Sequence, residues 1–186
     1  MRKVIAAINM TLDGFCDHTA IDPDAEIHQH YTDLITDGGV ILYGRITYQL
    51  MQFWQTLIEK PSGTKSLDDF AVAIDRIPKI VFSHQLKSTD PSIVGWKTST
   101  LANKPLEEII SELKQQPGTD ILIGCRSLIM QLLNLNLIDE LQLCVHPVVA
   151  GKGLPLFDKI NDRTTFKLSV TKLFNGGAIL LYYKRA

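Results

Sequence analysis

Three short segments combine glycine, arginine or hydroxyl groups in patterns that suit a phosphate group. Gly44-Arg45-Ile46-Thr47 and Gly124-Cys125-Arg126-Ser127 each follow a short apolar run and precede residues at helical spacing, and Ser83-His84 follows a third apolar run. A helix reached through a glycine turn offers unpaired backbone N–H groups and partial positive charge, and an arginine fork matches phosphate oxygens. Taken singly, each segment is explained at least as well by an ordinary turn, a capped helix or a polar loop.

Two carboxylates could supply a proton to a substrate. Alternation along Glu140–His146 predicts a strand whose apolar side chains share one face. The other face is polar, and it carries Glu140, Gln142, Cys144 and His146. A polar face next to a site fits a substrate wall with Glu140 as its principal acid, whereas an edge strand with its polar side in solvent is the alternative. Asp13 is the second candidate, and its alternative is a turn-forming aspartate before Gly14.

Neither the cysteines nor the histidines form a metal-binding pattern. Cys16, Cys125 and Cys144 are odd in number and have no CxxC spacing, which argues against a disulfide framework or a zinc site and favours reduced thiols. His28 and His30 are two residues apart on a predicted helix, so their imidazoles point to different sides. We therefore expect no metal.

Strands and helices must position these groups. Short apolar or β-branched runs predict strands at Lys3–Asn9, Val40–Tyr43, Pro78–Phe82, Ile93–Trp96 and Ile121–Ile123. Helical spacing predicts helices at Asp24–Asp37, through Leu50 and Trp54, and at Leu67–Arg76, Leu106–Leu113 and Ser127–Leu135. Two alternating runs, Thr165–Phe174 and Ala178–Lys184, flank the hairpin signal Asn175-Gly176-Gly177. This order predicts a three-layer α/β fold, a mostly parallel mixed sheet with helices on both faces and a C-terminal antiparallel hairpin.

Composition limits the kinds of protein this chain can be. With 186 residues, 45% hydrophobic and 21% charged, it fits one globular domain spanning residues 1–186. The formal net charge of −1 comes without any run of like charge, which argues against nucleic acid or a membrane surface as partner and favours a small molecule. Its N-terminus lacks the apolar stretch of a signal peptide, so we expect a cytoplasmic protein.

The ordered set of motifs resembles the dihydrofolate reductase-like family. TLDGF, LYGRITY, KIVFS, and LIDEL followed by HPVVAGKG occur in the family's order over essentially the whole chain. Within the family, the chain is most similar to the reductase domain of the bifunctional riboflavin-biosynthesis deaminase-reductase and its stand-alone relatives. The resemblance implies an NADPH-dependent reductase whose phosphate-binding turns meet along one edge of a mostly parallel sheet. No GxGxxG motif follows a strand, as the resemblance also implies.

The resemblance also assigns residues to the site. It implies contacts with the cofactor phosphates at Gly44, Arg45 and Thr47, and with the adenosine 2′-phosphate at Ser83 and His84. The later phosphate turn falls on Gly124, Cys125, Arg126 and Ser127. Residues on the nicotinamide side are Ala7, Leu12, Asp13 and Gly14, and residues toward the substrate are Asn9, His28 and Gln142. The acid of the D-E-L motif, which approaches the substrate in the riboflavin-type branch, is Glu140.

Two departures from the family pattern bear on this assignment. The phosphate turn is usually Gly-Gly, commonly joined by a cis peptide, but its second position here is Cys125. A cis bond before a residue other than proline costs about 2.5–4 kcal/mol, so either the turn is rebuilt or its strain is tolerated. The matching part of the first helix, near Ile27–Tyr31, has His28 and His30 and no carboxylate beyond Glu26 to orient a pterin. Dihydrofolate is therefore not the expected substrate.

The sequence thus predicts an NADPH-dependent reductase that transfers hydride to a C=N or C=O group of a small heterocyclic or sugar-linked substrate, in the manner of 5-amino-6-(5-phosphoribosylamino)uracil reductase. The alternative is a non-catalytic module that keeps the fold and binds a dinucleotide or another ligand without turnover. A third possibility is a purely structural protein. The apolar C-terminal hairpin around Ile179–Tyr183 is a possible contact for a homodimer.

Overall fold

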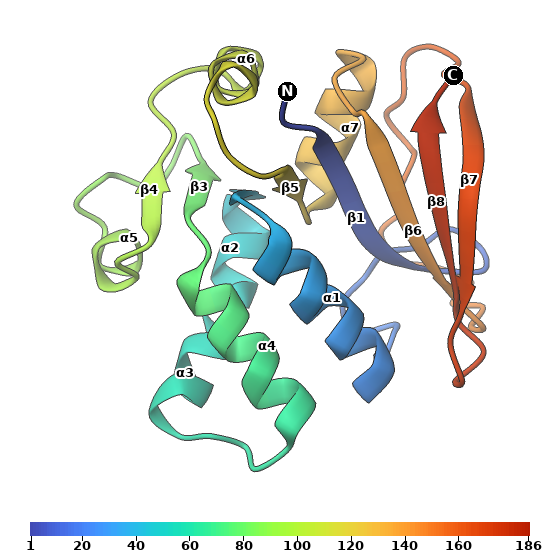
Figure 1. Ribbon diagram of the computed structural model, residues 1–186, viewed down its shortest axis with the longest axis horizontal. Helices are drawn as coiled ribbons and strands as arrows, with labels where there is room; N and C mark the ends of the chain where they lie inside the picture. The colour runs from blue at the N-terminus through green and yellow to red at the C-terminus, as the bar shows by residue number, and fades with distance from the viewer.

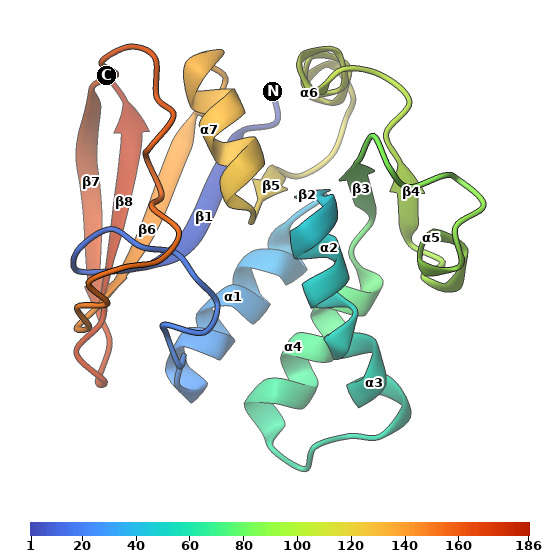
Figure 2. The ribbon, with the colours of Figure 1, turned by 180° about the vertical axis from the view of Figure 1, so that it is seen from behind.

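An eight-stranded mixed sheet organises the computed structural model, which describes all residues 1–186 (Figures 1 and 2). The strands are β1 (Val4–Thr11), β2 (Val40–Gly44), β3 (Lys79–Phe82), β4 (Ser99–Leu101), β5 (Ile121–Ile123), β6 (Glu140–His146), β7 (Phe166–Leu173) and β8 (Ile179–Arg185). Their spatial order is β4-β3-β2-β5-β1-β6-β8-β7. The first six in this order run parallel, and β8 and β7 complete the sheet as an antiparallel hairpin beside β6. The predicted fold class is confirmed.

Helices cover both faces of the sheet. They are α1 (Ala25–Asp37), α2 (Arg45–Met51), α3 (Phe53–Glu59), α4 (Lys65–Arg76), α5 (Pro91–Gly95), α6 (Leu106–Gln115) and α7 (Arg126–Asn134). The pair α1 and α4 packs on the side that faces the viewer in Figure 1, while α7 and α2 face the viewer in Figure 2. None of the helices is long and apolar enough to cross a membrane.

Two local predictions are wrong. The run Ile93–Trp96, predicted as a strand, lies at the end of helix α5 and just after it, and the fourth strand is Ser99–Leu101. Asp90 caps this helix by accepting the Ser92 N–H at 2.9 Å, and Pro91 occupies its first turn. This capped start outweighs the preference of a short β-branched run for a strand. The helix predicted through Leu50 and Trp54 is two short helices that meet at Gln52.

Strand β5 is shorter than its neighbour β1, so the second half of β1 has no partner strand on that side. The last pair between β1 and β5 is Ala6 with Ile123, whereas β1 and β6 stay paired as far as Thr11 with His146. From Ala7 to Thr11, the β5-facing edge of β1 therefore has no strand beside it. We call this stretch the ladder gap. Ligands of open α/β sheets bind outside the carboxyl ends of the strands, so the ladder gap is the place to look for a site.

Candidate functional site at the carboxyl edge of the sheet

The three segments with phosphate-binding character lie at one edge of the sheet. Strands β3, β2 and β5 are parallel neighbours, and the pair Gly44 with Phe82 marks the end of β2 and β3. Ser83 therefore follows its strand beside Gly44, and Gly124 follows β5 on the other side. This meeting of the segments, which the sequence predicts, is confirmed.

The turns after β2 and β5 touch each other. The Gly44 N–H donates to the Cys125 Sγ at 3.2 Å, and a Cβ added to Gly44 would lie 2.8 Å from the Ser127 Oγ. Glycine at position 44 thus lets the first turn of α7 come close. Cys125 has φ −134° and ψ 137°, an ordinary extended conformation, and every peptide bond of the chain is trans. The turn is therefore rebuilt around cysteine, and burial raises the pKa of the thiol.

Several groups at this edge remain able to bind an anion. Cys125, the N-cap of α7, makes no side-chain capping bond of good geometry, although the Leu128 N–H lies near its thiol; the N–H groups of Arg126 and Ser127 stay open. The Arg45 guanidinium lies on α2 and donates only to the Gln49 Oε1, at 3.1 Å. The Ser83 Oγ accepts the N–H groups of Gln85 and Leu86, both at 3.0 Å, which leaves its O–H free to donate. His84 beside it is exposed.

Arg126, by contrast, already has partners within the chain. Its Nε donates to the Pro155 carbonyl at 2.5 Å, and its Nη2 forms an ion pair with Asp158. The arginine thereby holds the loop that follows β6 against α7. A contact with cofactor phosphate, as the resemblance implies, requires Arg126 to share or leave Asp158.

Asp13 also holds a loop. Its carboxylate accepts the Thr11 hydroxyl at 2.6 Å and the N–H groups of Ala150 and Gly151 at 3.1 and 2.7 Å. The Thr11 hydrogen bond, supported by the backbone N–H groups, lowers the pKa of Asp13 to about 2. A group that stays ionised at neutral pH has no proton to give, so this geometry favours a loop anchor over the predicted proton donor.

Replacing Asp13 with asparagine is expected to free the loop that contains Lys152. Asparagine keeps one acceptor oxygen but loses the charge that strengthens the bonds from Ala150 and Gly151. Trypsin should then cut after the exposed Lys152 several-fold faster, as followed by mass spectrometry. Asp22→Asn, an exposed change with no hydrogen bond to lose, is the control. Equal cleavage rates in the two variants would contradict an anchoring role.

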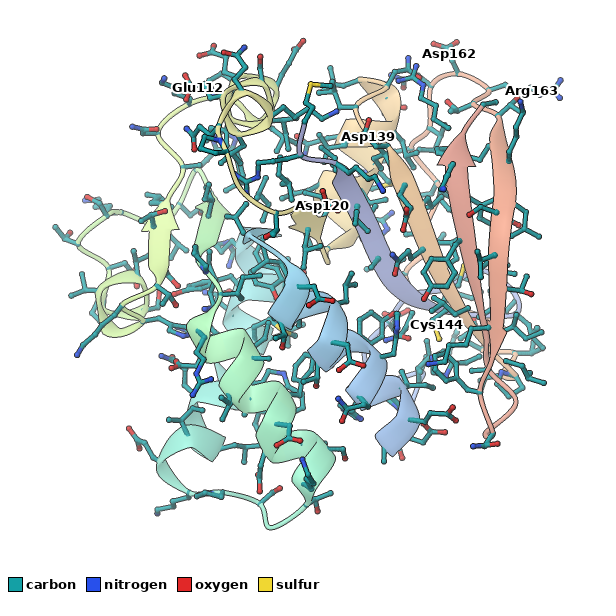
Figure 3. All side chains as sticks on the ribbon, viewed as in Figure 1. Glu112, Asp120, Asp139, Cys144, Asp162 and Arg163 are labelled. Atoms are coloured by element: carbon teal, nitrogen blue, oxygen red, sulfur yellow. The ribbon has the colours of Figure 1, made fainter.

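Glu140 lies away from the carboxyl edge. It begins β6 and pairs with Ile5 near the start of β1, and six residues further along the strand, about 20 Å away, His146 ends it. Figure 3 shows the same separation, with the preceding Asp139 and the later Cys144 at different ends of β6. Around Glu140 there is instead a polar cavity of about 330 Å³ lined by Met1, Arg2, Lys3, Asp139, Glu140, Lys184 and Arg185. The structure does not bring this predicted acid to the phosphate-binding turns.

The polar face of β6 is buried. Gln142, Cys144 and His146 expose 3%, 0% and 5% of their surface, because β8 pairs with β6 and α1 lies over this face. The predicted alternation is confirmed, while the alternative of an edge strand with its polar side in solvent is wrong. Gln142 donates to the Glu140 Oε1 at 2.7 Å and stays far from the edge.

Of the three residues predicted to face the substrate, only Asn9 lies at the ladder gap. The His28 ring packs against Trp54 and Phe70, with 5.9 Å between ring centroids in both pairs, and its Nδ1 lies 2.9 Å from the Asp24 carbonyl. His28 is therefore part of the packing between helices.

The residues predicted on the nicotinamide side follow one another along β1 and its loop. Ala7 is buried at the start of the ladder gap, Leu12 is exposed, and Gly14 takes the positive φ of 87° that the turn needs.

Two residues that the sequence did not assign to the site contact Asn9. The Tyr31 hydroxyl donates to the Asn9 Oδ1 at 3.1 Å, and the His146 Nε2 lies 2.9 Å from the same oxygen. With the Asn9 amide in this orientation, its oxygen accepts, and His146 is in the tautomer that carries the proton on Nε2. Burial lowers the pKa of His146 and raises that of Tyr31 well above 10, so both are neutral at pH 7. Alternation along β6 placed His146 on the polar face, but nothing in the sequence paired it with α1.

Comparison with known proteins points to one family. The sequence model of the RibD C-terminal domain family matches residues 2–180 of this chain. The Bacillus subtilis protein YyaP is 32% identical over 190 residues, which cover 98% of this chain and 94% of that protein. A solved structure from Shewanella sp. PV-4, whose name assigns it to riboflavin biosynthesis, has a TM-score of 0.75 at 18% identity and covers 100% of this chain and 99% of its own. A diaminohydroxyphosphoribosylaminopyrimidine deaminase/5-amino-6-(5-phosphoribosylamino)uracil reductase from Thermotoga maritima has a TM-score of 0.66 at 17% identity, and the match covers 100% of this chain and 57% of that longer one.

Proposed function

Because this chain belongs to the RibD C-terminal domain family, we propose that it is a reductase that transfers a hydride from NADPH to a C=N or C=O carbon of a small heterocyclic or sugar-linked substrate. One observation carries the proposal: Gly44-Arg45-Ile46-Thr47, Ser83 and the first turn of α7 lie side by side at the carboxyl edge, next to the ladder gap. The Thermotoga maritima neighbour, whose name includes a uracil reductase, supports a pyrimidine as the substrate class.

The residues at this edge fit a dinucleotide phosphate. The open N–H groups of α7 and the Arg45 guanidinium would hold the pyrophosphate, and the free O–H of Ser83 would reach a 2′-phosphate. A side chain at position 44 would meet Ser127, so the glycine keeps this cradle narrow. NADPH, when bound, supplies the hydride. The chain's own contribution is to hold the phosphates and to place the substrate at the ladder gap.

A second candidate function is a dinucleotide-binding module without turnover. It is favoured by one observation, that neither predicted acid has a proton to give at the carboxyl edge. Glu140 lies at the far end of β6, and Asp13 is ionised and hydrogen-bonded within its loop. A reductase with this arrangement would take its proton from water or from another group, whereas a binding module needs none.

Arg45→Ala is expected to weaken NADPH binding by about 10- to 100-fold, because a charge-assisted hydrogen bond to phosphate contributes about 1.5–3 kcal/mol. Isothermal titration of the purified protein with NADPH measures the affinity. Arg76→Ala, which removes an exposed arginine at the end of α4, is the control and should leave the affinity unchanged.

Binding and turnover of NADPH test both candidate functions. No binding of NADPH by the natural protein at millimolar concentration would overturn both. Binding without NADPH oxidation across a panel of imines, pyrimidines and pteridines would leave the module and exclude the reductase. NADPH oxidation is followed as the loss of absorbance at 340 nm. A rate that is lower in Arg45→Ala and unchanged in Arg76→Ala would establish the reductase.

A further inference from the structure

The Asn9 carboxamide is fixed by two donors. Tyr31, from α1, and His146, from the end of β6, both donate to its oxygen. In this orientation His146 carries its proton on Nε2, whereas an overturned amide would need the other tautomer of His146 and a Tyr31 hydroxyl that accepts. The structure has the amide oxygen turned inward, toward Tyr31 and His146.

The amide nitrogen of Asn9 is left free in this orientation. It makes no hydrogen bond within the chain, and it is absent from the buried polar atoms that lack a partner, which are on His30, Ser99 and Gln142. The nitrogen therefore reaches the surface. Asn9 lies three residues beyond Ala6, the last residue of β1 that pairs with β5, and so belongs to the ladder gap.

We propose that Tyr31 and His146 are positioning residues that hold the Asn9 NH2 group ready to donate a hydrogen bond to a carbonyl oxygen or ring nitrogen of the substrate. Asn9 then selects ligands that present an acceptor and disfavours those that present only a donor. A fixed, partly buried donor discriminates well, because a ligand without an acceptor leaves it unpaired. This inference rests on the proposed function only in taking the ladder gap as the substrate's place.

Both positioning residues are suited to this role in their neutral forms. Tyr31 keeps its hydroxyl proton, because burial raises its pKa, and donates to Asn9 throughout the physiological range. The neutral His146 presents Nε2–H to the same oxygen. The Cys144 Sγ lies 3.6 Å from this Nε2. A third donor could not be accommodated by the amide oxygen's two lone pairs. The oxygen is saturated from inside the protein, so only the nitrogen is offered to a ligand.

The test compares two small ring compounds that differ in hydrogen-bonding character. N-methyl-2-pyridone presents a carbonyl acceptor and no donor, and aniline presents an N–H donor. In NMR titrations of ¹⁵N-labelled protein, we expect N-methyl-2-pyridone to bind at least about fivefold more tightly than aniline and to shift the Asn9 side-chain NH2 signals. Asn9→Asp keeps the shape and still accepts from Tyr31 and His146, but offers an acceptor in place of the donor. This variant should reverse the preference.

Variants of His146 separate positioning from mere stability. His146→Gln places an N–H donor where Nε2 was, whereas His146→Asn places it near the position of Nδ1, out of reach of Asn9. We expect the preference for N-methyl-2-pyridone to persist in His146→Gln and to fall about threefold or more in His146→Asn and Tyr31→Phe. Melting temperatures, measured in parallel, identify any variant that fails to fold.

The outcomes distinguish this inference from the proposed function, because the titrations need no NADPH. A natural protein that does not prefer N-methyl-2-pyridone, or an Asn9→Asp variant with an unchanged preference, would overturn the inference even if NADPH is oxidised. Equal preferences in folded His146→Gln and His146→Asn would overturn the positioning role. A reversed preference in Asn9→Asp together with no NADPH binding would leave the inference standing and remove the reductase.

Discussion

The free energy of unfolding is expected to rise with pH from about 7 to about 8.5, because Lys79 is buried. Lys79 begins β3 and is 1% exposed, and its Nζ reaches the carbonyl of Asp75 near the end of α4. The Nζ donates to the Ile77 carbonyl at 2.8 Å and the Thr98 Oγ1 at 2.7 Å, and lies 4.2 Å from the centre of the Trp96 ring. These contacts and nearby Asp75 oppose the cost of burial, but burial is the larger effect and lowers the pKa of Lys79 to about 7.

The sign of this pH dependence follows from proton binding. In the unfolded chain the lysine has a pKa of about 10.4 and keeps its proton throughout this range, whereas the folded protein releases it near pH 7. The unfolded state therefore binds more protons, and raising the pH favours folding by at most about 1.4 kcal/mol per unit. Above about pH 8.5 the trend reverses, because the cysteine thiols ionise more readily in the unfolded chain. Burial raises the thiol pKa of Cys16 to about 11 and of Cys144 to about 12 in the fold.

Urea denaturation at several pH values measures the effect. Lys79→Met should remove the Lys79 contribution of about 2 kcal/mol between the two limits, which the cysteine thiols partly offset in the natural protein. Lys97→Met, which changes an exposed lysine close by, is the matched control and should keep the rise. A Lys79→Met variant with the same pH dependence as the natural protein would show that another group titrates. Methionine leaves the acceptors of Nζ unpaired, so this variant is also expected to be less stable at every pH.

The order of the elements could be predicted because it depends on local patterns. Alternation, helical spacing and turn residues indicated β1, β2, β3, β5 and the C-terminal hairpin to within a few residues. The error at Ile93–Trp96 arose where two local signals conflict, a β-branched run and the capped start at Asp90. Local pattern alone could not decide between them, because contacts with distant segments also hold the helix: the Tyr48 hydroxyl donates to the Ser92 carbonyl at 2.7 Å, and the Trp96 Nε1–H donates to Asp75 at 2.9 Å.

The site could be predicted only in part, because it depends on contacts between distant segments. Glycine followed by arginine or serine identified the phosphate-binding turns, since each turn is a local feature. The role of a charged residue depends on what lies opposite it. Asp139, in the LIDEL motif, accepts the Val4 N–H at 2.8 Å and pairs with Lys114 at 2.7 Å, so it fixes the start of β1. Alternation placed Glu140 on a polar face but gave no indication that α1 covers that face, nor of which end of β6 meets the ladder gap.

His30 is a second buried polar residue near the polar face of β6, and its burial has an energetic cost. It projects from α1 among Tyr31, Phe174 and Tyr182, with ring centroids 5.1, 6.0 and 6.3 Å away. Its Nε2 is buried and makes no hydrogen bond of good geometry, although the Gln142 side chain lies near enough to oppose the shift of the His30 pKa. Burial, reinforced by the positive charge of Lys172, lowers the pKa of His30 to about 4. The folded protein therefore keeps this histidine neutral well below the pH at which the unfolded chain protonates it.

The protein is accordingly expected to lose about 3 kcal/mol of unfolding free energy through His30 as the pH falls from about 6.5 to about 4, because only the unfolded state takes up this proton. His30→Phe should remove most of this loss, since phenylalanine fits among three aromatic rings and does not titrate. His18→Asn, an exposed change, is the control. Urea denaturation at pH values across this range measures the difference, and an unchanged slope in His30→Phe would assign the acid sensitivity to His146 or to carboxylates instead. At pH 7 the variant is expected to be at least as stable as the natural protein, because it no longer buries a nitrogen without a partner.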